Sequence, residues 1–293
     1  WSPSVISLST LSLTFFTASS IHASAMKDDF WIYIGGTLLA LLVACAIFAP
    51  KLAPHDPSRQ NLGNDLQVFT IEHPLGTDKL GRDILSRTLF GSRISLLVGV
   101  STVAISISIG LFIGSISGYF GGWLDQLLMR AVDILLAFPG ILLAIAFTAL
   151  LGPGLDHVII ALCLIGWTGY ARLVRGEILS LRAQEYVHAA RALGCTPARV
   201  IVVHLLPNLL PPLLIQATFG LAAAIIAEGS LSFLGLGVEP PTASWGSMLN
   251  EGRQFLLVAP HLTTYPGLAI MLTVLSLNLL GDALQNRLRS SGS

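Results

Sequence analysis

Charged residues are scarce in this sequence: they make up 11% of its 293 residues, whereas hydrophobic residues make up 53%. A soluble domain carries about 25% charged residues, so an ordinary soluble protein is excluded. The net charge is zero, which argues against a nucleic-acid partner. The hydrophobic residues gather in runs of about 20, the length that crosses a bilayer as a helix. These runs lack the alternation of barrel strands, so we expect an all-α polytopic membrane protein.

Motifs for chemistry are absent as well. The three cysteines, Cys45, Cys163 and Cys195, have neither metal-ligand spacing nor a plausible disulfide pairing. No G-x-x-x-x-G-K-[ST] phosphate loop occurs, and no cluster of His, Cys and carboxylate residues has metal-ligand spacing. We therefore expect no catalytic residue, no metal and no cofactor on this chain, which is not expected to be an enzyme. Any energy source must be another subunit or an ion gradient.

About six membrane-spanning helices can be drawn. They cover approximately residues 30–49, 94–118, 124–151, 157–174, 209–231 and 262–280. Pro139 and Gly140 predict a kink in the third of these helices. A polar segment rich in proline follows the first span, from about 51 to 92. Residues 1–25 are interpreted as a leader or extension of unknown status and are left out of the fold prediction.

Residues 185–208, EYVHAARALGCTPARVIVVHLLPN, predict a structured loop between the fourth and fifth spans. Gly194 suits the left-handed residue that closes a helix. Thr196 suits an N-cap and Pro197 suits the first position of the next helix. Pro207 is expected to stop that second helix. The segment therefore predicts a helix-turn-helix that protrudes from the bilayer, and a rigid protruding loop can receive force from a soluble partner.

This loop resembles the loop of the permease subunits of binding-protein-dependent ABC importers. The family pattern EAA…G…LP is matched at Ala189, Ala190, Gly194, Leu206 and Pro207. Two positions depart from it, because His188 replaces the family glutamate and His204 replaces an isoleucine. The run AARALG…R…HLLPN is closer to the version found in the peptide and nickel branch. On spacing alone, an ordinary cytoplasmic helical connection is an equal alternative.

In that family the loop docks into a groove on the ATP-hydrolysing subunit. The resemblance therefore implies a cytoplasmic ATPase-coupling loop. Its expected residues are Glu185, His188, Ala189, Ala190, Arg191, Gly194, Arg199, His204 and Pro207. The small residues Ala189, Ala190 and Gly194 are expected to allow close docking. Arg191 and Arg199 are expected to supply charged contacts to the ATPase.

Three further segments resemble the same branch and occur in family order. They read HPLGTDKLGRDILSR at 73–87, SFLGLG…PPT…WG within 232–246, and PGLAIMLTVLSLNLLGDAL at 266–284. The resemblance also divides the chain. The parts are 26–93, the first span with its outer loop; 94–289, an ABC importer permease core domain; and 290–293, a tail.

The resemblance implies a permease subunit that forms half of a translocation path for short peptides. The implied partners are a homologous second permease, two ATPase subunits or domains that carry ATP and Mg, an extracytoplasmic substrate-binding protein and the lipid bilayer. The implied location is the bacterial cytoplasmic (inner) membrane, with both termini in the cytoplasm. Nine Lys and Arg residues on that side against seven on the other agree with this orientation. A permease for nickel or another small solute is the alternative, and an ion-driven secondary transporter is a rival class.

Several residues near or within the spans are predicted to have specific roles. Gly110, Gly114 and Gly118 recur every four residues and predict a smooth face for close helix packing. Glu228, at the outer end of the fifth span, is expected to face a vestibule on the transport path or to snorkel to water. Trp245 is interpreted as an anchor at the membrane interface, and the family resemblance gives the alternative that its surface meets the extracytoplasmic binding protein.

Two ion pairs are also predicted from spacing. Arg130 and Asp133 lie one turn apart in the third span, close enough for a structural salt bridge. Asp83 and Arg87 are four residues apart and are expected to pair on the exposed face of an interfacial helix.

Overall fold

The computed structural model describes residues 8–291, with side chains described for residues 30–288. The leader or extension expected at 1–25 and the tail expected at 290–293 therefore lie partly outside the described residues. Within 8–291 the chain forms helices joined by loops, with a single isolated β-bridge between Thr77 and Asp83 and no strand. The predicted all-α fold is confirmed.

Five helices are long and apolar enough to cross a membrane. They are the Phe30–Leu52 part of α1 (Leu8–Leu52), α2 (Ile84–Phe120), α5 (Leu155–Leu181), the continuous stretch Pro197–Phe233 that ends with α8 (Leu206–Phe233), and the His261–Leu288 part of α10 (His261–Ser291). A sixth span results if α3 (Gly122–Leu136) and α4 (Gly140–Leu151) count as one broken span. The prediction of about six spans is therefore confirmed.

The third predicted span breaks sharply where the sequence predicts a kink. The axes of α3 and α4 differ by 82°, far more than a proline kink in a continuous helix. Pro139 has an extended backbone (φ −59°, ψ 121°) and sits at the N-cap of α4. Because Pro139 leaves the helical region altogether, α3 ends before it and a new helix starts with Gly140.

The second span begins at Ile84, directly after the loop between α1 and α2, rather than at the predicted residue 94. Asp83 is the N-cap of α2, and its side chain accepts a hydrogen bond from the backbone N–H of Ser86. The short interfacial helix and the transmembrane helix expected from the sequence are therefore one element. The predicted Asp83–Arg87 pair is wrong, because the Asp83 carboxylate turns back to cap the helix and Arg87 bonds Glu251 instead.

Pro207 does not stop the helix that begins at Pro197. The chain continues from α7 (Pro197–Arg199) through a π-helical segment, Val200–Leu205, directly into α8. Pro207, Pro211 and Pro212 each lack a backbone N–H, so several carbonyls of this stretch lose their intrahelical donors. The wider π-helical turn just before Pro207 is one of the adjustments by which a helix absorbs such a loss.

The α2–α5 pair packs closely through three of the glycines of α2, which are Gly110, Gly114 and Gly118. A Cβ on Gly110 would lie 2.5 Å from Cβ of Tyr170, and one on Gly114 would lie 2.6 Å from the carbonyl oxygen of Ala171. A Cβ on Gly118 would lie 3.0 Å from the carbonyl oxygen of Arg175. Close approach of the two backbones thus requires glycine at this spacing.

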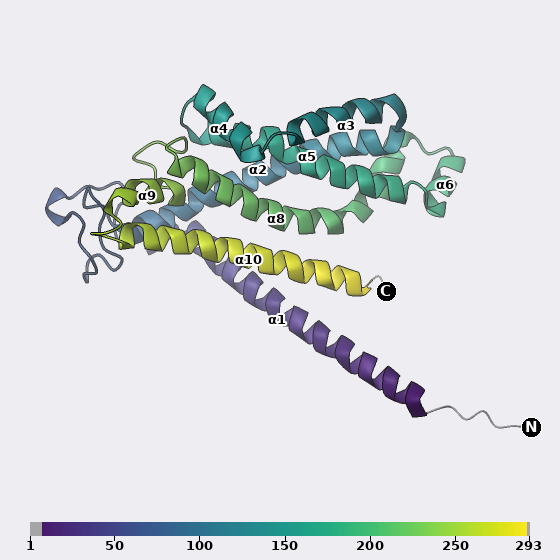
Figure 1. Ribbon diagram of the computed structural model, residues 1–293, viewed down its shortest axis with the longest axis horizontal. Helices are drawn as coiled ribbons and strands as arrows, with labels where there is room; N and C mark the ends of the chain where they lie inside the picture. The colour runs from purple at the N-terminus through teal and green to yellow at the C-terminus, as the bar shows by residue number, and fades with distance from the viewer. Residues whose placement is uncertain (1–7, 292–293) are drawn as a thin grey trace, which may run out of the picture.

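The two ends of the bundle carry different structures (Figure 1). At one end lie α6 (Glu185–Ala192) and the C-terminal part of α10. At the other end lie the loop between α1 and α2 and the short helix α9 (Trp245–Gly252). The α6 end corresponds to the cytoplasmic side of the sequence interpretation, and the α9 end to the outer side.

Candidate functional site

The predicted helix-turn-helix is present as α6, a turn at Gly194, and α7. Gly194 has φ +83°, and its N–H bonds the carbonyl oxygen of Arg191 while the N–H of Cys195 bonds that of Ala190. This pattern of two bonds is the Schellman motif that ends a helix on glycine. Thr196 then caps α7 by accepting a hydrogen bond from the N–H of Arg199. The local sequence therefore determines the geometry of this turn.

One face of α6 is fixed to the body of the protein. Val187 and Ala190 are buried, with Ala190 6% exposed. Val187 belongs to a hydrophobic cluster with Ile178 of α5, Val200 of the π-helical segment and Leu209 of α8. Ala190 therefore packs within the chain and is not available for docking, which corrects its expected role. This cluster joins α6 to α5 and α8.

The opposite face of α6 and the turn are exposed to solvent. The exposed residues of the predicted set are Glu185, His188, Ala189, Arg191, Gly194, Arg199 and Pro207, whereas His204 is half-buried. Arg191 lies 4.7 Å over the ring of Tyr119 in a cation–π contact. A Cβ on Gly194 would meet nothing within 4 Å, so this glycine is required for its backbone conformation rather than for space.

Leu193 is a functional candidate that the sequence analysis missed. Its side chain is 85% exposed at the tip of the turn, beside Gly194. A leucine that is exposed on a rigid turn is available for an apolar contact with a partner. The available signal was an apolar residue directly before the helix-closing glycine. We name the exposed residues Glu185, His188, Ala189, Arg191, Leu193 and Arg199 the coupling surface.

Ion pairs fix the helices beneath the coupling surface. Arg175 of α5 donates two hydrogen bonds to the Asp125 carboxylate of α3, at 2.5 and 2.7 Å. Arg182 donates to the carbonyl oxygen of Gly118 at the end of α2. The predicted Arg130–Asp133 pair is wrong: Asp133 accepts from Arg172, because α5 packs beside α3. These contacts join α2, α3 and α5 at this end.

The outer end buries residues that the sequence analysis expected to be exposed. Glu228 is 2% exposed, and its carboxylate accepts hydrogen bonds from Ser95 and Ser232. It therefore neither faces a vestibule nor snorkels within this chain. Trp245 is 1% exposed and donates from Nε1 to the carbonyl oxygen of Thr88 at 3.0 Å. It is a core residue between α9 and α2 rather than an interface anchor.

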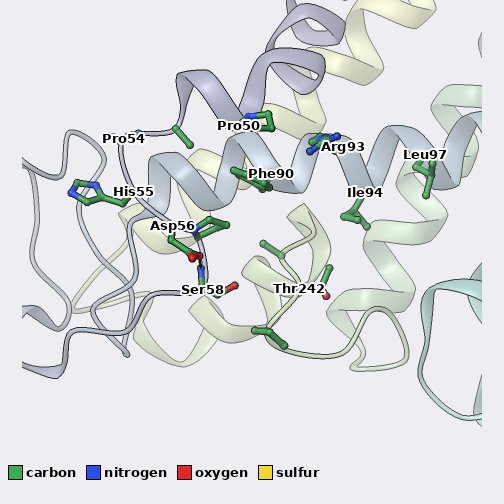
Figure 2. A pocket seen from close by; sticks show the side chains of 14 residues that line it. Pro50, Pro54, His55, Asp56, Ser58, Phe90, Arg93, Ile94, Leu97 and Thr242 are labelled. Atoms are coloured by element: carbon green, nitrogen blue, oxygen red, sulfur yellow. Dashed lines mark hydrogen bonds between the residues drawn. The ribbon is translucent and has the colours of Figure 1, made fainter.

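A cavity of about 890 Å³ opens at the outer end between α1, α2 and the loop before α9 (Figure 2). Its lining combines apolar side chains with the guanidinium of Arg93 and the carboxylate of Asp56. Arg93 lies 6.0 Å over the ring of Phe90 on the preceding turn of α2. The cavity therefore offers one cation, one carboxylate and apolar walls. No sequence motif marked this cavity, because its walls come from three separate segments.

The same end also brings together residues that sequence spacing did not connect. His55, His73 and Asp83 offer ligand atoms within 4.8 Å of one another. No metal-ligand spacing marks them in the sequence, because 17 residues separate His55 from His73 and nine separate His73 from Asp83 within the loop between α1 and α2.

Comparison with known families identifies the membrane domain. A family profile described as "binding-protein-dependent transport system inner membrane component" matches residues 110–291. A second profile, "N-terminal TM domain of oligopeptide transport permease C", matches residues 32–68. Together the two profiles cover the first span and most of the predicted core.

Two curated relatives are similar over most of this chain. The dipeptide transport system permease protein DppC of Alkalihalophilus pseudofirmus is 44% identical over 90% of this chain and 86% of its own length. The glutathione transport system permease protein GsiD of Escherichia coli O6:K15:H31 is 46% identical over 85% of this chain and 82% of its own length.

A solved structure of the MetNI methionine ABC transporter, in an inward-facing conformation, has a similar fold. Its TM-score is 0.56 at 22% identity, with 72% of this chain and 98% of that chain covered. A second crystal form gives a TM-score of 0.52 at 20% identity.

Proposed function

Since this chain belongs to the family of binding-protein-dependent transport system inner membrane components, we propose that it forms half of a translocation path for short peptides. It is the permease subunit of an ATP-driven ABC importer, and ATP hydrolysis takes place on separate subunits. The relatives named for dipeptide and glutathione transport support a peptide substrate over nickel. The outer cavity adds support, because its cation, carboxylate and apolar walls suit the charged ends and side chains of a short peptide.

The coupling surface is the proposed binding site for the ATPase. A separate ATPase subunit docks on the exposed face of α6, where Leu193 enters an apolar groove and Arg191 and Arg199 meet acidic side chains. When ATP closes the two ATPases, the coupling surface moves with them. The buried face of α6 passes this motion to α5 and α8, which switches the path between inward-facing and outward-facing states.

The proposed assembly has four further parts. A homologous second permease completes the path, two ATPase subunits or domains hold ATP and Mg, and an extracytoplasmic binding protein delivers substrate at the α9 end. The complex sits in the bacterial inner membrane, with the α6 end and both termini in the cytoplasm. Figure 1 supports this orientation, since the described end of α10 lies at the same end as α6.

Purification from mild detergent, followed by mass spectrometry, tests the assembly. We expect a second permease and an ATPase with a Walker motif to accompany the chain, and uptake of a labelled dipeptide to depend on both. A chain that purifies alone and transports under an ion gradient would assign it to the secondary-transporter class instead.

Replacement of Gly194 tests the coupling role. Gly194→Leu forces a bulky residue into φ +83° and should distort the turn, so that uptake is lost while membrane insertion is kept. Gly176→Leu is the matched control, because Gly176 lies in α5 with open space around it and an ordinary φ. Normal dipeptide uptake by Gly194→Leu would refute the coupling role of this turn.

A further inference from the structure

Three potential metal ligands converge at the outer end of the molecule. His55 follows α1, His73 lies in the loop between α1 and α2, and Asp83 caps α2. Their ligand atoms all lie within 4.8 Å of one another. A shared ion would therefore join the start of the loop, its later part and the N-terminus of α2.

The imidazoles of His55 and His73 both lie near the same carboxylate oxygen of Asp83. Nδ1 of His73 lies 2.9 Å from Oδ1 of Asp83, and Nδ1 of His55 lies 4.0 Å from it. The two rings pack with their centroids 4.6 Å apart. Two nitrogens and one oxygen thus lie close together, and a shift of the side chains, chiefly that of His55, would bring them to zinc-ligand distances of about 2.0–2.2 Å.

The carboxylate is already oriented by its other oxygen. Oδ2 of Asp83 accepts hydrogen bonds from the backbone N–H and the hydroxyl of Ser86, both at 2.7 Å. Ser86 in turn accepts a hydrogen bond from the backbone N–H of His55 at 3.1 Å. Such outer hydrogen bonds are what fix the ligands of protein metal sites. Oδ1 is left to face the imidazoles.

The Asp83 carboxylate and the His55 ring leave positions open for a cation. The Asp83 side chain is fully buried, and among the described residues it has no Lys or Arg partner; only the two histidines lie within ion-pair distance. Nδ1 of His55 is buried and has no hydrogen-bond partner within the described part of the chain. A buried carboxylate is normally paired or bound to a metal. One divalent cation would neutralise the charge of the Asp83 carboxylate and would also give Nδ1 of His55 a partner.

The site can be reached from solvent. A cavity of about 600 Å³ is lined by all three residues, and Asn61, Asn64 and Glu72 also line it. It leaves room for a water molecule or a fourth ligand, and two imidazoles with one carboxylate and an open position form a set that zinc accepts.

We propose that His55, His73 and Asp83 form a binding site for one divalent transition metal ion, with zinc as the ion that best suits the ligand set. The metal takes the place of the hydrogen bond between His73 and Asp83. Each histidine binds it through a neutral Nδ1 and keeps its proton on Nε2. The ion fixes the loop between α1 and α2 to the N-terminus of α2. This inference rests on the outer loop alone and does not depend on the transported substrate.

Zinc titration of the purified complex tests the site. The complex in detergent is stripped with a chelator and titrated with zinc ions alone, with calorimetry and metal analysis as readouts. We expect one zinc per chain whose affinity falls by more than about tenfold in His55→Gln. His55→Gln keeps the His73–Asp83 hydrogen bond, so the loop should fold. Asp83→Asn is a second variant, because asparagine still caps α2 while the charge is removed.

His188→Gln is the matched control, since His188 lies exposed on α6 at the opposite end. It should bind zinc as the unmodified chain does, and zinc should raise the melting temperature of both. Absence of zinc binding by the unmodified chain would overturn the proposal. Equal zinc affinity in His55→Gln, Asp83→Asn and the unmodified chain would overturn it as well, because the bound ion would then lie elsewhere.

Discussion

The two ends of this molecule differ in whether their charged residues are buried or exposed. At the outer end, Arg82 and Arg87 are buried between two carboxylates, those of Asp78 and Glu251. At the α6 end, the charged residues of the coupling surface are exposed. The first arrangement joins the loop, α2 and α9 into one rigid unit. The second leaves side chains available to a partner.

This contrast separates residues that hold the fold from residues that transmit motion. Removal of one member of a buried ion pair leaves an uncompensated charge and is strongly destabilising. An exposed charge on a helix contributes little to stability. We therefore expect substitutions at the outer end to unfold the protein and substitutions on the coupling surface to uncouple it.

The largest effect is expected for Arg87→Ala. Arg87 is 1% exposed and lies 3.1 Å from Glu251 and 3.6 Å from Asp78. Its loss should lower the free energy of unfolding by about 3–5 kcal/mol, seen as a lower melting temperature in detergent. Arg93→Ala, on the same helix but exposed, is the control and should change little. Equal melting temperatures for the two variants would show that the buried network contributes nothing.

The next effect concerns the helix pair that connects the two ends. Gly114→Val would place atoms 2.6 Å from the carbonyl oxygen of Ala171, so α2 and α5 must move apart. We expect a loss of about 1–3 kcal/mol and a smaller monodisperse fraction in size-exclusion chromatography. Gly169→Val is the control, because a Cβ there meets nothing within 4 Å. If both variants behave alike, the close approach of the helices is not required.

Substitution of Glu228 tests whether this buried carboxylate at the outer end contributes to stability rather than to transport. Glu228→Ala would leave the hydroxyls of Ser95 and Ser232 without their acceptor, at a cost of about 1–3 kcal/mol. Glu228→Gln keeps an acceptor and should cost less. Thermal unfolding and dipeptide uptake are measured together. Reduced uptake at unchanged stability would restore the vestibule role, one of the two alternatives that the sequence left open for this residue.

Local patterns were predictable from the sequence because neighbouring residues determine them. The turn at Gly194, the Thr196 cap and the break at Pro139 all depend on backbone preferences within a few positions. The family pattern could likewise be recognised from short segments. The spans themselves follow from the length of the apolar runs.

Partners distant in sequence could not be predicted. Arg87 bonds Glu251, which lies 164 residues away, in place of Asp83 four residues before it. Spacing identifies which charges can meet on one helix, but only packing decides which of them do. For the same reason the sequence predicted neither the burial of Glu228 nor the convergence of His55 and His73 on Asp83.

The smallest effect on stability, and one of the largest on function, is expected at Leu193. Leu193→Asp removes an 85% exposed side chain, so the free energy of unfolding should change by less than about 0.5 kcal/mol. Loss of the apolar contact and addition of a negative charge beside the proposed ATPase should reduce both ATPase co-purification and dipeptide uptake.

Leu257→Asp is the matched control for this substitution, because Leu257 is 100% exposed at the outer end. It changes a leucine that is at least as exposed, at the end opposite the proposed ATPase contact. We expect its ATPase recovery to equal that of the unmodified chain. Were Leu193→Asp to keep its ATPase while Leu257→Asp lost it, the orientation of the whole bundle would have to be reversed, since the ATPase would then bind where the buried charges lie.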